Sequence, residues 1–140
     1  MKIDLLKFFL DNILLIGVAF VSGAMLLWPM VRRGAGGASV NTLEATQLIN
    51  RQDAVVVDVR ESAEFGKGHI LNARNIPLSQ FEARCTEIDK FKAKPVILAC
   101  ETGNRSGAAA SVLRKRGFEQ VFNLSGGIAA WQQAGLPVEK

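Results

Sequence analysis

The chain has 140 residues, of which 49% are apolar and 21% charged, and its formal net charge is +4. This length suits one ordinary domain with a short appendage, and the apolar fraction excludes a low-complexity disordered protein. One histidine and two cysteines are too few for a structural zinc site or a disulfide scaffold, so we expect no metal. Nothing in the sequence points to a cofactor. No stretch combines dense lysine and arginine with aromatic residues, which argues against nucleic acid as a partner.

The first feature along the chain is an uncharged stretch of twenty residues, 12–31, between Asp11 and Arg32. As a helix it would reach about 30 Å, the thickness of the hydrocarbon layer of a bilayer. Trp28 lies near one end, where indole rings favour the membrane interface, and Arg32 and Arg33 follow directly. We therefore predict a transmembrane helix that serves as an uncleaved single-pass membrane anchor over residues 1–33. A cleaved signal peptide is the alternative.

A glycine-rich stretch, residues 34–39, follows the anchor and is expected to form a flexible linker to a domain over residues 40–140. Arg32 and Arg33 abut the span directly, which favours their side of the membrane as the cytoplasm. A free cysteine agrees with that orientation, because reducing compartments keep thiols reduced. We expect a membrane protein whose domain over residues 40–140 faces the cytoplasm.

The remaining chain alternates apolar runs with helical segments. Asn41, with Glu44 three positions later, is typical of a helix N-terminus. Continuous β-branched runs indicate strands that are buried on both faces of a sheet. Alternation of this kind predicts an α/β fold, a parallel sheet with helices on both faces. The expected helices are 41–50, 79–88, 106–116 and 128–134, and the expected strands are 54–57, 96–99 and 121–122.

The loop from Cys100 to Arg105 lies directly between a predicted strand and a predicted helix. Ligands of such folds bind beyond the carboxyl ends of the strands. Backbone N–H groups and the positive end of a helix stabilise an anion there, and the Cys100 thiolate is the first anion available. Gly103 permits a tight loop, and Arg105 could place a guanidinium beside the sulfur or a bound oxyanion. A buried structural cysteine is the alternative.

These observations define a candidate site. Cys100 is the expected nucleophile, and the second cysteine, Cys85, falls in a predicted helix where we expect it to pack in the core. Asp58 and Arg60 follow a buried strand and thus reach the same edge of the sheet, where we expect an ion-paired supporting role. The expected substrate-binding residues are Glu101, Thr102, Gly103, Asn104 and Arg105, and the supporting residues are Ser106, Asp58 and Arg60.

The stretch CETGNRS at 100–106, together with Asp58-Val-Arg60, Gly68-His-Ile70, Asn75-Ile-Pro77 and Leu124-Ser-Gly-Gly127, resembles the rhodanese-like domain family. The likeness covers about residues 40–140. It implies a five-stranded parallel sheet and a sulfurtransferase. In that activity Cys100 attacks a sulfane sulfur, carries it as a persulfide and passes it to a thiol or to cyanide.

Four residues separate Cys100 from Arg105, whereas related phosphatases have one more, so the resemblance favours sulfur over phosphoryl transfer. The expected partners are a small-molecule or protein sulfur donor, such as thiosulfate or a protein persulfide, and a thiol acceptor. Glu101 puts a negative charge at the loop, which favours a persulfide on another protein over thiosulfate. A membrane-tethered binding module without catalysis is the alternative, followed by a phosphatase or arsenate reductase. The sequence leaves the oligomeric state open.

Overall fold

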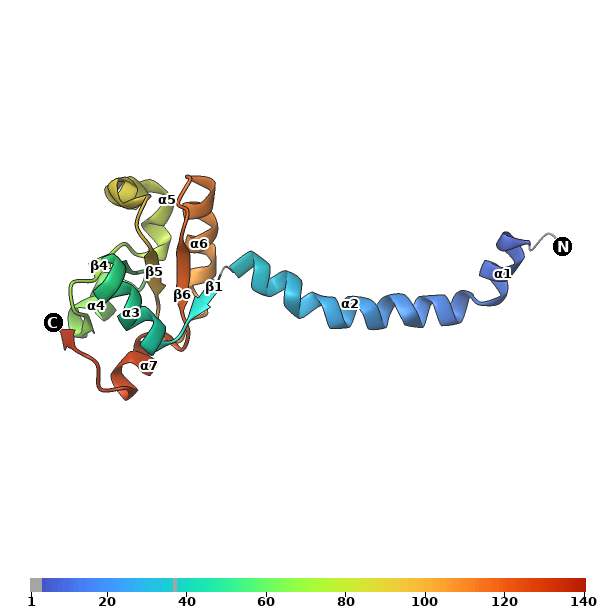
Figure 1. Ribbon diagram of the computed structural model, residues 1–140, viewed down its shortest axis with the longest axis horizontal. Coiled ribbons are helices and arrows are strands. Elements are labelled where there is room, and N and C mark those ends of the chain that lie inside the picture. Colours follow the sequence, from blue (N-terminus) through green and yellow to red (C-terminus); the bar gives the residue numbers. More distant parts are fainter. Residues whose placement is uncertain (1–3, 37) are drawn as a thin grey trace. The chain divides into compact units, whose positions relative to one another are not determined.

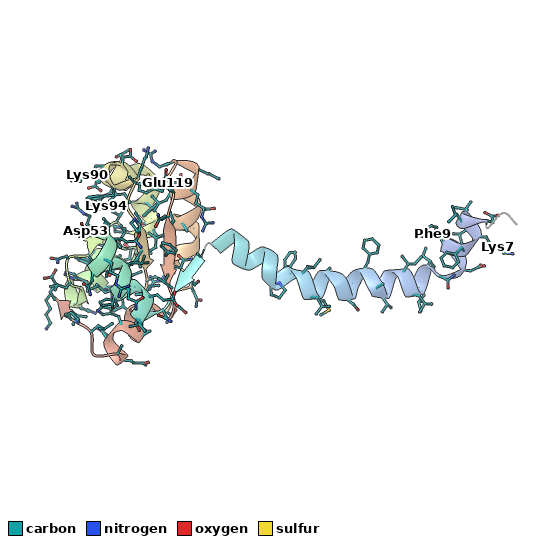
Figure 2. The ribbon with its side chains drawn as sticks, viewed as in Figure 1. Lys7, Phe9, Asp53, Lys90, Lys94 and Glu119 are labelled. Atoms are coloured by element: carbon teal, nitrogen blue, oxygen red, sulfur yellow. The ribbon has the colours of Figure 1, made fainter. Side chains whose placement is uncertain are left out.

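The computed structural model describes residues 4–36 and 38–140, and the chain divides in sequence after Gly34 into two compact units. The first unit holds α1 (Leu5–Asp11) and most of α2 (Ile13–Gly36). The side-chain amide of Asn12 donates to the carbonyl oxygen of Phe8 at 2.8 Å, which satisfies one acceptor at the end of α1. Large apolar side chains of this unit are exposed, from Leu5 at 66% to Trp28 at 58% (Figure 2).

The predicted uninterrupted membrane span is not supported by these helices. No single helix among the described residues is long and apolar enough to cross a membrane. The helix α1 and the stretch Ile13–Pro29 satisfy the requirement only as a pair, and they are bent by 73° at the break between them. The apolar segment is therefore divided near Asn12, where the sequence predicts that the span begins.

The structure also differs from the predicted linker over residues 34–39. The helix α2 continues to Gly36, and the strand β1 (Ala38–Val40) begins two residues later. Ala38 and Ser39 pair with Phe122 and Asn123 of a neighbouring strand. Sheet pairing gives their backbone groups partners within the protein, whereas the backbone of a solvated linker would bond to water.

The second unit is built on a five-stranded parallel sheet, as expected (Figure 1). Its strand order is β1-β6-β5-β2-β4, with every neighbouring pair parallel. A short antiparallel pair of β3 and β7 joins the C-terminal segment to the middle of the chain. The strands not yet given are β2 (Val55–Asp58), β3 (His69–Ile70), β4 (Arg74–Asn75), β5 (Val96–Ala99), β6 (Val121–Leu124) and β7 (Val138–Glu139).

Alternating residues of the central strands pack into two separate apolar clusters. Val57 and Leu98 belong to one cluster, which α5 (Phe81–Arg84) and α6 (Ser106–Lys115) cover. Their neighbours in sequence, Val56 and Ile97, belong to the other, which α3 (Thr42–Gln52) and α7 (Gly127–Gln133) cover. Successive strand side chains point to opposite faces, so continuous apolar runs bury both faces of this sheet.

The predicted helix over 79–88 is wrong as a single element. The structure has η1 (Leu78–Gln80), the four-residue α5, and η2 (Cys85–Phe91), of which η1 and η2 are 3₁₀ helices. The apolar residues Cys85, Ile88 and Phe91 recur every three residues. This spacing suits a 3₁₀ helix, in which residues three apart lie above one another. A further helix, α4 (Ser62–Lys67), was not predicted.

Candidate active site

Cys100 follows the last residue of β5 and is completely buried, with 0% of its surface exposed. The parallel register pairs Asp58, the last residue of β2, with Ala99. The residues that follow both strands therefore meet at one edge of the sheet, as the sequence predicts. The helix α6 begins at Ser106, so the loop 100–105 occupies the whole connection between strand and helix.

The sulfur atom of Cys100 accepts two hydrogen bonds from the backbone of its own loop. The N–H of Gly103 lies 3.0 Å from Sγ, and the N–H of Arg105 lies 3.3 Å from it. The thiol also lies 4.0 Å from Oγ of Ser106, which itself donates to the carbonyl oxygen of Gly103. Backbone N–H groups at the start of a helix favour a negatively charged sulfur over a neutral one.

Arg105 contributes its backbone to the sulfur, whereas its guanidinium lies elsewhere. Nη1 and Nη2 each donate to one carboxylate oxygen of Glu64 in α4, both at 3.2 Å. The hydrogen bond to Glu64 raises the pKa of Arg105, burial opposes this, and the charge of Glu64 adds to it. The guanidinium therefore makes an ion pair between the loop and α4, and no hydrogen bond joins it to the sulfur among the described residues. Arginine favours this bidentate geometry, in which two N–H groups donate to the two oxygens of one carboxylate. The expected role of Arg105 beside a bound oxyanion stays a prediction.

Protonation of Glu64 makes the stability of the fold depend on pH. The hydrogen bond from Arg105 lowers the pKa of Glu64 from its usual 4.5, with burial opposing. The pair therefore stabilises the fold above about pH 4.5 and loses its effect as pH falls through the lowered pKa. We expect Glu64→Gln to lower the melting temperature slightly at pH 7, and to lower it less at pH 3. Thermal unfolding followed by circular dichroism measures both, and an equal loss at both pH values would contradict the pair's role.

Asp58 and Arg60 form a buried ion pair that reaches the loop. Arg60 is 4% exposed, and its Nη2 donates to Asp58 Oδ2 at 2.8 Å and to the carbonyl oxygen of Gly68 at 2.7 Å. Its Nη1 donates to Oε2 of Glu101 at 3.3 Å. Burial alone would lower the pKa of Arg60, but the hydrogen bond and charge of Asp58, and then Glu101, raise it. The predicted supporting pair thus also holds Glu101, through one hydrogen bond from Arg60.

The start of α7 contacts the other side of the loop. The N–H of Ile128 donates to the backbone carbonyl oxygen of Cys100 at 2.9 Å. The N–H of Ala129 donates to the backbone carbonyl oxygen of Glu101 at 3.2 Å. Gly127 has a φ of +59°, and a Cβ there would lie 2.2 Å from the carbonyl oxygen of Cys100. Only glycine therefore lets α7 approach the loop this closely.

The predicted site residues separate into three groups in the structure. Gly103, Arg105 and Ser106 surround the sulfur, and Asp58, Arg60 and Glu101 form one charged network. Thr102 and Asn104 are exposed, and the amide of Asn104 donates to Thr102 Oγ1 at 3.3 Å. Sequence reasoning missed the contacts of Glu64 and Gly127. The Gly126-Gly127 pair before a short helix was the available signal for the second of them.

Comparisons with known proteins agree with this geometry. The model of the rhodanese-like domain family matches residues 41–134. The uncharacterized protein YibN of Escherichia coli is 45% identical over 96 residues, which cover 68% of this chain and 67% of that protein. A protein named sulfurtransferase from Allochromatium vinosum is 36% identical over 103 residues, or 71% of this chain and 94% of that one.

Solved structures give the same result. The crystal structure of a rhodanese-related protein from Thermoplasma volcanium is 32% identical, with a TM-score of 0.66. The match covers 74% of this chain and 98% of that one. The fold and the order of the loop motifs therefore point to the same group of proteins.

Proposed function

The chain belongs to the rhodanese-like domain family, and we propose that it is a sulfurtransferase that carries sulfane sulfur on Cys100. The observation that supports this most is the pair of backbone N–H groups on the cysteine sulfur, at 3.0 and 3.3 Å. Two donors already aligned on the sulfur need no rearrangement to stabilise its negative charge. A structural cysteine in an apolar core has no need of them.

The proposed reaction has two displacement steps. In the first, the Cys100 thiolate attacks the outer sulfur of thiosulfate, the S–S bond of the donor breaks, and sulfite leaves with the electron pair. In the second, an acceptor thiolate or cyanide attacks the outer sulfur of the Cys100 persulfide. The enzyme's S–S bond then breaks, and its electron pair returns to Cys100. No oxidant or reductant is needed, since each S–S bond broken is replaced by a new bond to the same sulfur.

The surroundings of the loop support sulfur transfer over phosphoryl transfer. The guanidinium of Arg105 pairs with Glu64, whereas a phosphate site would need that cation aimed at the bound oxyanion. Arg60 holds Glu101, which reduces the repulsion between its carboxylate and an anionic donor. Thiosulfate and a protein persulfide are both proposed donors, and a thiol is the proposed acceptor.

Steady-state kinetics test the proposed reaction. Purified protein is mixed with thiosulfate and cyanide, and thiocyanate formation is followed by its iron(III) complex. Because the sulfur is carried on the enzyme between two half-reactions, we expect parallel double-reciprocal lines. Thiosulfate is then replaced by an aryl phosphate and by arsenate with a reductant. Turnover of either substrate by a protein that forms no thiocyanate from thiosulfate and cyanide would contradict the proposal.

We also propose that the N-terminal helices attach the protein to a membrane, with the catalytic domain in the cytoplasm. The exposed apolar side chains from Leu5 to Trp28 support this, because water disfavours such a surface. The test is extraction of cell membranes with alkaline carbonate, which should leave the full chain in the pellet. A variant lacking residues 1–34 should be soluble, and equal release of both would contradict attachment.

A further inference from the structure

A recess of about 310 Å³ adjoins the active-site loop and is not used by the proposed displacement steps. We call it the charged recess, because four of its lining residues are ionisable. It lies between the end of α4, the loop and α7. Its lining residues are Arg60, Glu64, Lys67, Gly68, Glu101 and Gln132.

One wall of the charged recess is a fixed cation. Arg60 is 4% exposed and is held by Asp58 and by the carbonyl oxygen of Gly68, so its guanidinium cannot swing away. Nη1 carries two hydrogens, and among the described residues only Glu101 accepts from it, at 3.3 Å. An anionic group in the recess would find a further donor at this atom.

Lys67 supplies the second cation. It is the last residue of α4 and is exposed, and in the part of the chain that the structure describes it makes no ion pair or hydrogen bond. Its ammonium group is therefore available to a ligand without breaking an existing pair. The next residue, Gly68, also lines the recess and carries no charge.

The anionic groups of the recess are Glu101 and Glu64. Glu101 has 47% of its side chain exposed, and its carboxylate accepts a single hydrogen bond from Arg60. Glu64 is held by Arg105. With Asp58 and Arg105 included, the recess has three cationic and three anionic side chains, so its net charge is zero. Positive and negative groups nevertheless occupy separate positions around it. A neutral molecule with separated charges fits such a site better than an anion or a cation does.

We propose that the charged recess binds a small zwitterionic thiol, an amino-acid thiol with one ammonium and one carboxylate, as the sulfur acceptor. The carboxylate lies at Lys67 and Nη1 of Arg60, and the ammonium lies at Glu101. The thiol loses its proton to solvent, and its sulfur attacks the outer sulfur of the Cys100 persulfide. The S–S bond to Cys100 breaks, its electron pair returns to Cys100, and the acceptor leaves as an amino-acid persulfide. This inference rests on the proposed function and names the class of its acceptor.

The experiment separates loading from discharge. Wild-type protein is first loaded with thiosulfate and desalted, and the persulfide on Cys100 is confirmed by mass. Four thiol acceptors are then compared: cysteine has both charges, cysteamine only the ammonium, 3-mercaptopropionate only the carboxylate, and 2-mercaptoethanol neither. Each rate of sulfur loss is expressed as the ratio of wild type to variant, which removes differences in intrinsic reactivity between the acceptors.

The variant is Lys67→Gln, and the control is Lys115→Gln, which removes an exposed lysine at the far end of α6. We expect Lys67→Gln to slow discharge to cysteine and to 3-mercaptopropionate about threefold to fivefold. Discharge to cysteamine and to 2-mercaptoethanol should be unchanged, and Lys115→Gln should change none of the four.

Equal slowing of all four acceptors, or of none, would overturn the assignment of the recess while leaving sulfur transfer intact. Failure of the wild-type protein to load sulfur is a different result, because it would refute the proposed function itself.

Discussion

Replacing Cys100 by serine is expected to reduce thiocyanate formation on the order of a thousandfold or more, to the level of the uncatalysed reaction. Serine keeps an acceptor atom for the N–H groups of Gly103 and Arg105, so the loop retains its hydrogen bonds. A hydroxyl cannot carry sulfane sulfur as a persulfide. Thiosulfate and cyanide kinetics measure the loss, and a thermal unfolding curve shows whether the variant is folded.

Cys85 provides the matched control for this variant. It is also buried, at 1% exposed, and its thiol donates to the carbonyl oxygen of Glu82, a bond that serine can replace. Cys85→Ser should therefore retain most of the activity. A Cys100→Ser protein that is folded and still forms thiocyanate at the wild-type rate would exclude the persulfide mechanism.

The second large effect is expected for Gly127→Ala. A Cβ at this position would overlap the carbonyl oxygen of Cys100 at 2.2 Å and the carbonyl group of Glu101 at 2.7 Å. Because both are backbone atoms, the loop or the start of α7 must move. Overlap and the positive φ together should destabilise the fold by about 2–4 kcal/mol. Displacement of the loop should lower kcat/KM about a hundredfold.

Gly135→Ala separates overlap from backbone strain. Gly135 also has a positive φ, +70°, but nothing lies within 4 Å of a Cβ added there. Its replacement should cost about 1–2 kcal/mol and leave kcat/KM nearly unchanged. Chemical denaturation and steady-state kinetics on both variants give the comparison. Equal effects of the two substitutions on kcat/KM would show that α7 does not position the loop.

The parts of the fold that sequence predicted well are those fixed by local patterns. The apolar run of β5 and the small-residue helix α6 are continuous in sequence, and together they place Cys100 between them. The run 121–122 was also found, although β6 extends to Leu124. In each case the signal needs only a few neighbouring residues.

The parts that sequence missed depend on contacts between distant residues. Arg105 pairs with Glu64, 41 positions earlier, and no local pattern distinguishes that partner from the neighbouring sulfur. The contact of Gly127 with Cys100 likewise requires the packed fold. Near the N-terminus, the apolar segment is divided at Asn12, whose side chain donates to the carbonyl oxygen of Phe8. Composition does not reveal this break.

Mass spectrometry of the loaded protein addresses the central proposal most directly. The full chain is incubated with thiosulfate, and in parallel with a low-molecular-weight persulfide, then digested and examined at the peptide that contains Cys100. We predict that this peptide gains the mass of one sulfur atom and loses it again when cyanide is added. An unchanged peptide with both donors, in protein shown to be folded, would contradict sulfur transfer through Cys100.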